Sequence, residues 1–195
     1  MFVSDLQHFL DMPDDAPGPA RRMAEHLTMI VRAASAGDTG LAWASALTCI
    51  RRPNHRACPG NLVLRRVDIP SSIEWQCADC GDDGVISGWD HTPFDLRRSD
   101  TQQTTDSGVD VTVSPEVAST LRSLTLLDTI SELIVFRARA SHDGIIVLHG
   151  SEDDLDELIG YIAAEANHEN NRMRRKRLDT AFEILSLALE NTIRP

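Results

Sequence analysis

The N-terminal third of the chain carries one helical pattern of apolar residues. A helix is expected from Pro19 to Gly37, because the apolar side chains between them recur every three or four residues and form one face. These apolar residues are Met23, Leu27, Ile30 and Val31. The preceding residues 1–17 are rich in Asp and Pro, which favours turns over regular structure.

The middle of the chain changes to short β-like runs. Residues 43–50 form a mostly apolar run that is typical of a strand. Three further runs are separated by turn-forming residues and predict a small antiparallel meander. These runs cover residues 62–69, 73–77 and 84–89.

A polar segment divides the chain after the meander. Residues 99–108 hold no large apolar side chain and cannot contribute to a core. They are therefore the expected linker. It joins residues 1–98, with the helix and the meander, to an acidic region of residues 109–195.

The region after the linker begins with strand signals. Residues 109–113 alternate between apolar and polar, and Ser114 then begins a helix as its N-cap, with a proline at the next position. Residues 133–138 and 145–148 are strand-like and flank an Asp-Gly pair, which predicts a hairpin.

Two helices are expected to close the chain as a helical hairpin. Ser151 resembles the first residue of a capping box, and apolar residues follow it at helical spacing as far as Ala166. The final helix has its apolar residues between Leu178 and Leu189. The fold class that we predict is α+β: an N-terminal helix, a small antiparallel meander, and a C-terminal unit of strands with two or three helices.

Composition excludes several classes of protein. A chain of 195 residues with 42% hydrophobic and 25% charged residues is neither disordered nor fibrous. No window approaches the ~18 consecutive apolar residues of a membrane helix. The first residues have neither the basic start nor the apolar run of a signal peptide. We therefore expect a soluble, cytoplasmic protein.

All four cysteines lie within 32 residues in the middle of the chain. Cys77 and Cys80 are separated by two residues between two expected strands, and the glycine that follows them permits a tight turn. Cys49 and Cys58 are separated by eight residues, a looser spacing than usual. Structural zinc sites take four tetrahedral ligands. The four cysteines therefore predict zinc as a cofactor, bound in a zinc-ribbon-like meander.

Zinc would also stabilise this segment. A meander of about 45 residues with few large apolar side chains is marginal by itself, and metal binding adds its free energy to folding. Three other interpretations stay open: His55 replaces a cysteine as ligand, Cys77 and Cys80 perform thiol redox chemistry, or the cysteines are plain buried thiols.

The residues around the cysteines form a longer motif. Its parts are Cys49-x-Arg-Arg-Pro53, Cys58-Pro-Gly60, Ile73-Glu-Trp-Gln-Cys77-x-x-Cys80-Gly-Asp-x-Gly84-x-Ile-Ser-Gly-Trp89 and, further on, Glu165-Ala-Asn-His-Glu169. This motif resembles uncharacterised bacterial proteins with a zinc-ribbon-like centre. The resemblance covers residues 45–98 well and the C-terminal helices loosely. It implies the cysteine pairing and a bacterial origin, and it brings no assigned activity.

The net charge of −11 is a local property. Residues 99–171 hold 3 basic and 14 acidic side chains, whereas residues 48–66 hold five arginines and no acid. These arginines are Arg51, Arg52, Arg56, Arg65 and Arg66. Guanidinium groups pair with phosphates, so this segment is a candidate contact for nucleic acid or another partner. The alternative is that these arginines form salt bridges with the acidic C-terminal half of the chain.

Three other groups of residues are weaker candidates. A second basic run begins the last helix and is interpreted either as a phosphate site or as a solvated face paired with nearby acids. This run comprises Arg172, Arg174, Arg175, Lys176 and Arg177. Trp75 and Trp89 are interpreted either as a stacking platform for bases or as part of the hydrophobic core. Glu165 and His168 have the spacing of a di-metal motif, but the second motif is missing.

The sequence therefore favours a non-catalytic zinc-binding interaction protein that is associated with nucleic acid or with regulation. One alternative is an enzyme of unknown class with its site near Glu165, His168 and Glu169. Another is an assembly subunit that binds a basic partner through the acidic surface of residues 99–171.

Overall fold

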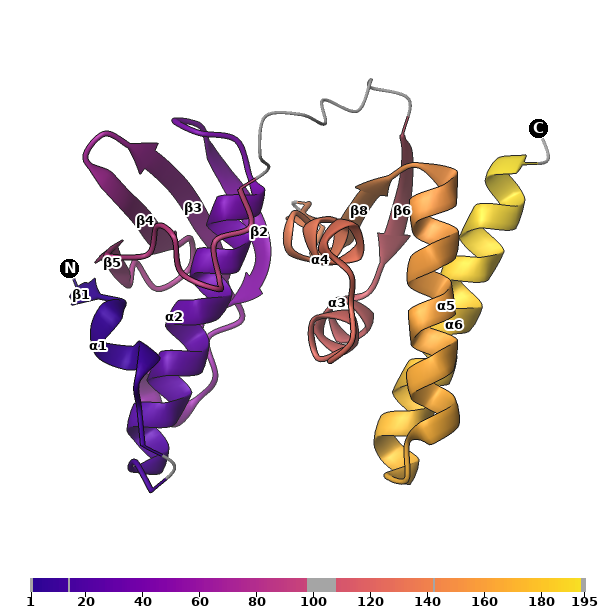
Figure 1. Ribbon diagram of the computed structural model, residues 1–195, viewed down its shortest axis with the longest axis horizontal. Helices are drawn as coiled ribbons and strands as arrows, with labels where there is room; N and C mark the ends of the chain where they lie inside the picture. The colour runs from indigo at the N-terminus through magenta and orange to yellow at the C-terminus, as the bar shows by residue number, and fades with distance from the viewer. Residues whose placement is uncertain (1, 14, 98–107, 142, 194–195) are drawn as a thin grey trace. The chain divides into compact units, whose positions relative to one another are not determined.

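The computed structural model describes residues 2–13, 15–97, 108–141 and 143–193. The chain divides into two compact units, Met1–Ser99 and Asp100–Pro195 (Figure 1). Eight strands and six α-helices occur in the described residues, so the α+β class is confirmed. The linker expected at residues 99–108 lies outside the described residues except for Gly108.

The first unit contains five strands in the order β1-β5-β4-β3-β2. Their bounds are β1 Phe2–Asp5, β2 Ala42–Thr48, β3 Asn61–Asp68, β4 Ser71–Cys77 and β5 Asp83–Ser87. Neighbours from β2 to β5 are antiparallel, as the expected meander requires, and β1 adds to β5 in parallel.

Helix α2 (Gly18–Ala36) covers one face of this sheet (Figure 1). Leu27, Ile30 and Val31 are fully buried on its inner face and pack towards β2, β3 and β4. The apolar spacing of the sequence therefore places the helix correctly, and its contacts build the core of the first unit.

The prediction that residues 1–17 form only turns is wrong. Strand β1 and helix α1 (Gln7–Leu10) occupy this segment, and Leu6 between them is fully buried. The partner strand β5 lies about 80 residues further along the chain, so no local pattern reveals the pairing. Gly84 of β5 permits it, because a Cβ there would lie 2.6 Å from the carbonyl oxygen of Phe2.

The second unit contains three strands in the order β7-β8-β6 and four helices. Their bounds are β6 Val109–Val113, α3 Pro115–Arg122, α4 Thr129–Phe136, β7 Arg139–Ala140, β8 Ile146–Gly150, α5 Glu152–His168 and α6 Arg172–Ile193. Helices α5 and α6 pack along each other as the expected hairpin (Figure 1). Both N-caps form as predicted: Ser114 accepts from the backbone N–H of Val117, and Ser151 from that of Asp154.

The prediction of a strand over residues 133–138 is wrong, because helix α4 covers most of them. The Asp128 carboxylate caps this helix by accepting a hydrogen bond of 2.8 Å from the backbone N–H of Ser131. All four residues from Leu133 to Phe136 are buried. The run therefore has no polar residues at regular spacing, and such spacing is what distinguishes a helix from a strand in a sequence. A hairpin to β8 does form around the Asp-Gly pair, but its first strand is the short β7 at Arg139–Ala140 and not residues 133–138.

Among the residues that the structure describes, no helix combines the length and the hydrophobicity needed to cross a bilayer.

Candidate metal centre

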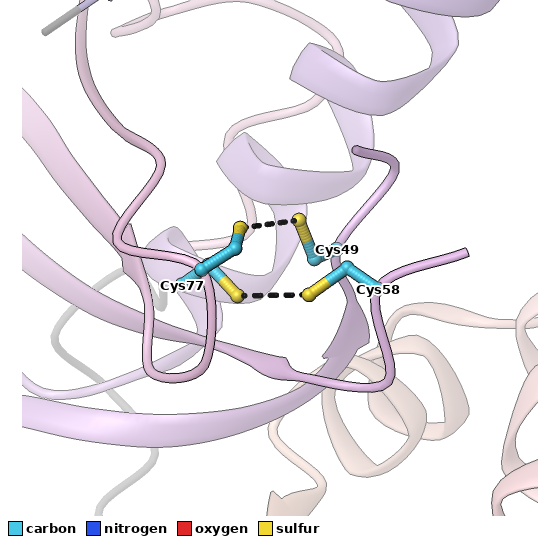
Figure 2. Close-up of side chains that lie close together, drawn as sticks. Cys49, Cys58 and Cys77 are labelled. Carbon is cyan, nitrogen blue, oxygen red and sulfur yellow. Dashed lines mark hydrogen bonds between the residues drawn. The ribbon is translucent and has the colours of Figure 1, made fainter. Parts of the chain in front are cut away.

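The sulfur atoms of all four cysteines meet at one place in the first unit. Every pair of these atoms lies within 4.8 Å. The Cys58 and Cys77 sulfurs point towards each other and are 3.6 Å apart (Figure 2), and those of Cys49 and Cys80 are 3.7 Å apart. A tetrahedral site with zinc–sulfur bonds of about 2.3 Å needs sulfur separations of about 3.8 Å. The four cysteines are free thiols, and their arrangement can hold a metal ion.

Two loops at one end of the sheet supply these ligands. Cys49 and Cys58 lie in the loop between β2 and β3, while Cys77 ends β4 and Cys80 lies in the turn before β5. The loops meet because β3 pairs with both neighbouring strands, and its residue Leu62 lies opposite Cys77. The sheet therefore brings together cysteines that are up to 31 positions apart.

The Cys77–Cys80 turn closes through backbone hydrogen bonds. The N–H of Gly81 donates to the carbonyl oxygen of Cys77 over 3.1 Å, and the N–H of Cys77 donates to that of Asp82 over 2.7 Å. Gly81 has a φ of +69°, a conformation that favours glycine. The expected tight turn after Cys80 is therefore present.

The longer Cys49–Cys58 loop folds back on itself. The N–H of Cys58 donates to the carbonyl oxygen of Arg51 over 2.9 Å, and the N–H of Cys49 donates to that of Gly60 over 2.8 Å. The N–H of Arg51 also points at the Cys49 sulfur, 3.4 Å away. These hydrogen bonds fold the loop so that the Cys49 and Cys58 sulfurs lie close together despite the eight residues between the two cysteines.

Gly60 is a residue of the site whose role sequence reasoning missed. A Cβ at this position would lie 2.7 Å from the Cys77 sulfur and 2.9 Å from the Cβ of Asp79. The Cys58-Pro-Gly60 string was a visible signal, but it indicated only a turn. The structure shows that Gly60 makes room for a ligand on the opposite loop.

Burial distinguishes the four thiols. Cys49, Cys58 and Cys77 are buried, whereas Cys80 is exposed. Burial raises the pKa of the Cys49 thiol to about 12. A hydrogen bond from the backbone of Asp82 lowers the pKa of the Cys80 thiol. Metal ions bind thiolates, so a metal entering this site must displace protons, that of Cys49 among them.

The geometry gives less support to the other interpretations of the cysteines. His55 lies in the three-residue turn Pro53–His55, is exposed, and is not among the residues that gather around the sulfurs. Two sulfur contacts with hydrogen-bond geometry join one loop to the other: Cys77 lies 3.6 Å from Cys58, and Cys80 lies 3.7 Å from Cys49. A redox pair formed by Cys77 with Cys80 is therefore not the pairing that these contacts favour.

The five candidate arginines separate into two groups. Arg65 pairs with Glu74 at 2.7 Å across two strands. Arg66 pairs with Asp68 and also donates to the carbonyl oxygens of Ser35 and Gly37. These two arginines therefore hold the sheet and the end of α2 together. Their carboxylate partners lie in the first unit, and not in the acidic C-terminal half where the alternative interpretation placed them.

The remaining three arginines lie in the loop between Cys49 and Cys58 and are exposed. The Arg51 Nε atom is 3.6 Å from a carboxylate oxygen of Asp82, and this pair links the two cysteine loops. Within the described part of the chain, Arg52 and Arg56 form no ion pair. The loop thus presents two unpaired guanidinium groups and a third that is loosely paired.

The tryptophans do not form a surface platform. Trp75 is 6% exposed and Trp89 is fully buried, so of the two interpretations the core one holds and the stacking platform does not. His26 of α2 packs edge-on against Trp75, and burial lowers the pKa of this histidine. The Arg97 guanidinium lies 4.6 Å above the Trp89 ring centre. Both rings therefore fill the space beneath the surface of the first unit.

The residues around Glu165 form an ion-pair network. Arg174 pairs with the carboxylates of Glu165 and Glu169, which are largely buried, and donates to the carbonyl oxygen of Ser123 over 2.9 Å. The side chain of His168 is exposed. Arg174 is the one member of the second basic run with such partners among the described residues, and it joins α5 to α6. The paired-face interpretation is confirmed at this arginine.

No protein-family model, no curated protein and no solved structure matches this chain. The resemblance to bacterial proteins with a zinc-ribbon-like centre therefore stays a prediction.

Proposed function

We propose that the chain is a non-catalytic interaction protein that holds one zinc ion through Cys49, Cys58, Cys77 and Cys80. The observation that carries the proposal is the meeting of four sulfurs within 4.8 Å. Four thiolates fill a tetrahedral shell and leave no position for a substrate, which is typical of a structural site. Soft thiolate ligands select zinc over magnesium, calcium or manganese.

The proposed zinc ion has a structural role. It joins the β2–β3 loop to the β4–β5 turn, where Arg51 and Asp82 form the ion pair between these loops. Seven residues in succession, Arg51–Ala57, are exposed and contribute nothing to the core. Metal binding therefore supplies the free energy that orders this loop.

The ordered loop is the proposed contact surface. Arg51, Arg52 and Arg56 are presented on it, and residues 48–66 contain no acid. Guanidinium groups pair with phosphate oxygens through two parallel hydrogen bonds, so nucleic acid is the partner that this surface suits best. Arg65 and Arg66 are not part of this proposed contact surface, because their guanidinium groups already bind partners within the fold.

Elemental analysis tests the metal. Purified protein that has been dialysed against a mild chelator is expected to retain one zinc ion per chain, and iron is expected to be absent. The variant Cys77→Ser is expected to lose the zinc, because it removes a buried ligand. A zinc content far below one per chain in the unaltered protein contradicts the proposal.

Fluorescence polarisation with DNA and RNA tests the surface. Binding is expected at low salt and should weaken as salt rises, since each phosphate contact releases counterions. The double variant Arg52→Gln/Arg56→Gln should reduce the slope of log affinity against log salt by about 2. Arg65→Gln is the matched control and should leave the slope unchanged, because its partner is Glu74. Absence of binding at low salt rules out the nucleic-acid partner.

A further inference from the structure

The four cysteines of the cluster differ in their exposure to solvent. Three of the cysteines are 7% exposed or less, whereas Cys80 is exposed in the turn before β5. A small oxidant that diffuses from solvent therefore meets the Cys80 sulfur first. Zinc-bound cysteines are thiolates, the form of cysteine that reacts with peroxides.

The hydrogen-bonded sulfur contacts point to Cys49 as the partner of Cys80. The Cys80 sulfur is 3.7 Å from that of Cys49, while Cys77 already faces Cys58 at 3.6 Å. A disulfide bond has a sulfur separation of about 2.05 Å, so Cys49 and Cys80 must approach by about 1.7 Å. Both residues lie in loops, which can move by this distance more easily than a cysteine within a strand.

We propose that Cys80 is a site of oxidation by peroxide and that Cys49 resolves it, with release of the zinc ion. The Cys80 thiolate attacks one oxygen of hydrogen peroxide, the O–O bond breaks, and hydroxide leaves with Cys80 as a sulfenic acid. The Cys49 thiolate then attacks the Cys80 sulfur. An S–S bond forms, the S–O bond breaks, and the second hydroxide leaves. Two protons convert the hydroxides to water, so two thiolates are oxidised as one peroxide is reduced.

This inference rests on the proposed function for the zinc ion and names how the same site is regulated. Oxidation removes two of the four ligands, because disulfide sulfurs are no longer thiolates. Cys58 and Cys77 alone form an incomplete shell. Zinc release then removes the bond between Cys58 and the metal, which fixes the far end of the loop that carries Arg52 and Arg56.

The experiment treats the full chain with hydrogen peroxide in small molar steps. Zinc release is followed with a coloured chelator, and the disulfides are mapped by mass spectrometry of unreduced digests. We expect one zinc ion released for each peroxide consumed, and the first disulfide to join Cys49 with Cys80. A first disulfide between Cys77 and Cys80, or between Cys58 and Cys77, overturns the proposal. Retention of all thiols and of the zinc does so as well.

A ligand-preserving variant provides the control. Cys80→His keeps a zinc ligand but removes the exposed thiol, so its zinc should resist peroxide. Cys77→His leaves Cys80 in place and should stay sensitive. The zinc content before peroxide tests the proposed function alone. In a chain that retains its zinc, the disulfide map tests the oxidation site, so each failure is recognisable separately.

Discussion

Gly60 is the position where the metal centre leaves no room for a side chain. In Gly60→Ala the new Cβ would lie 2.7 Å from the Cys77 sulfur and 2.9 Å from the Cβ of Asp79. Neither neighbour is the end of a long flexible chain, so a cysteine loop must shift. Overpacking of this kind costs about 1–3 kcal/mol. If the shift falls on the metal ligands, zinc affinity should drop by about 5- to 150-fold.

Competition with a chelator of known affinity measures this loss, and urea denaturation of the zinc-loaded chain measures the accompanying change in stability. Gly160→Ala is the matched control, because its Cβ meets nothing within 4 Å in helix α5. Alanine there should raise stability by about 0.5–1 kcal/mol and leave zinc affinity unchanged. Equal zinc affinity in Gly60→Ala and the unaltered chain would show that the missing side chain at Gly60 is not needed for the metal site.

Three further predictions concern the metal and the second unit. Zinc affinity should rise from about pH 6 to about pH 8, with proton release on binding, because burial raises the pKa of Cys49 to about 12 and its proton must leave; competition titrations at both pH values check this. Arg174→Gln should lower the melting temperature by about 2–4 °C, since it leaves two largely buried carboxylates unpaired, whereas the exposed Arg177→Gln should not change it. Asp128→Ala should cost about 1 kcal/mol in denaturation at neutral pH by removing the N-cap of α4. Hydrogen bonds from the Ser131 side chain and backbone outweigh burial and hold the Asp128 pKa low, so this cost should disappear as pH falls through the folded pKa.

The cysteine cluster was predictable because its signals are local. Four cysteines within 32 residues, with glycines after Cys80 and near Cys58, indicate a shared site before any contact is known. The helix caps at Ser114 and Ser151 were predictable for the same reason, since a cap depends on three or four consecutive residues. Amphipathic helices such as α2 also show their buried face in the sequence.

The features that escaped prediction depend on contacts distant in sequence or on full burial. Strand β1 is fixed by β5, far along the chain. Helix α4 is buried along its whole second half, so its apolar run has no period. Which of the five arginines are paired depends on the register of β3 against β4, because this register places Arg65 opposite Glu74. The steric role of Gly60 depends on the approach of two loops.

X-ray absorption at the zinc edge of the purified chain tests the central claim most directly, because it reports the atoms bound to the metal. We expect zinc with four sulfur neighbours at about 2.3 Å. A shell that includes nitrogen or oxygen at about 2.0–2.2 Å would show that His55 or another residue has replaced a cysteine. That result, or the absence of bound zinc, contradicts the four-cysteine centre.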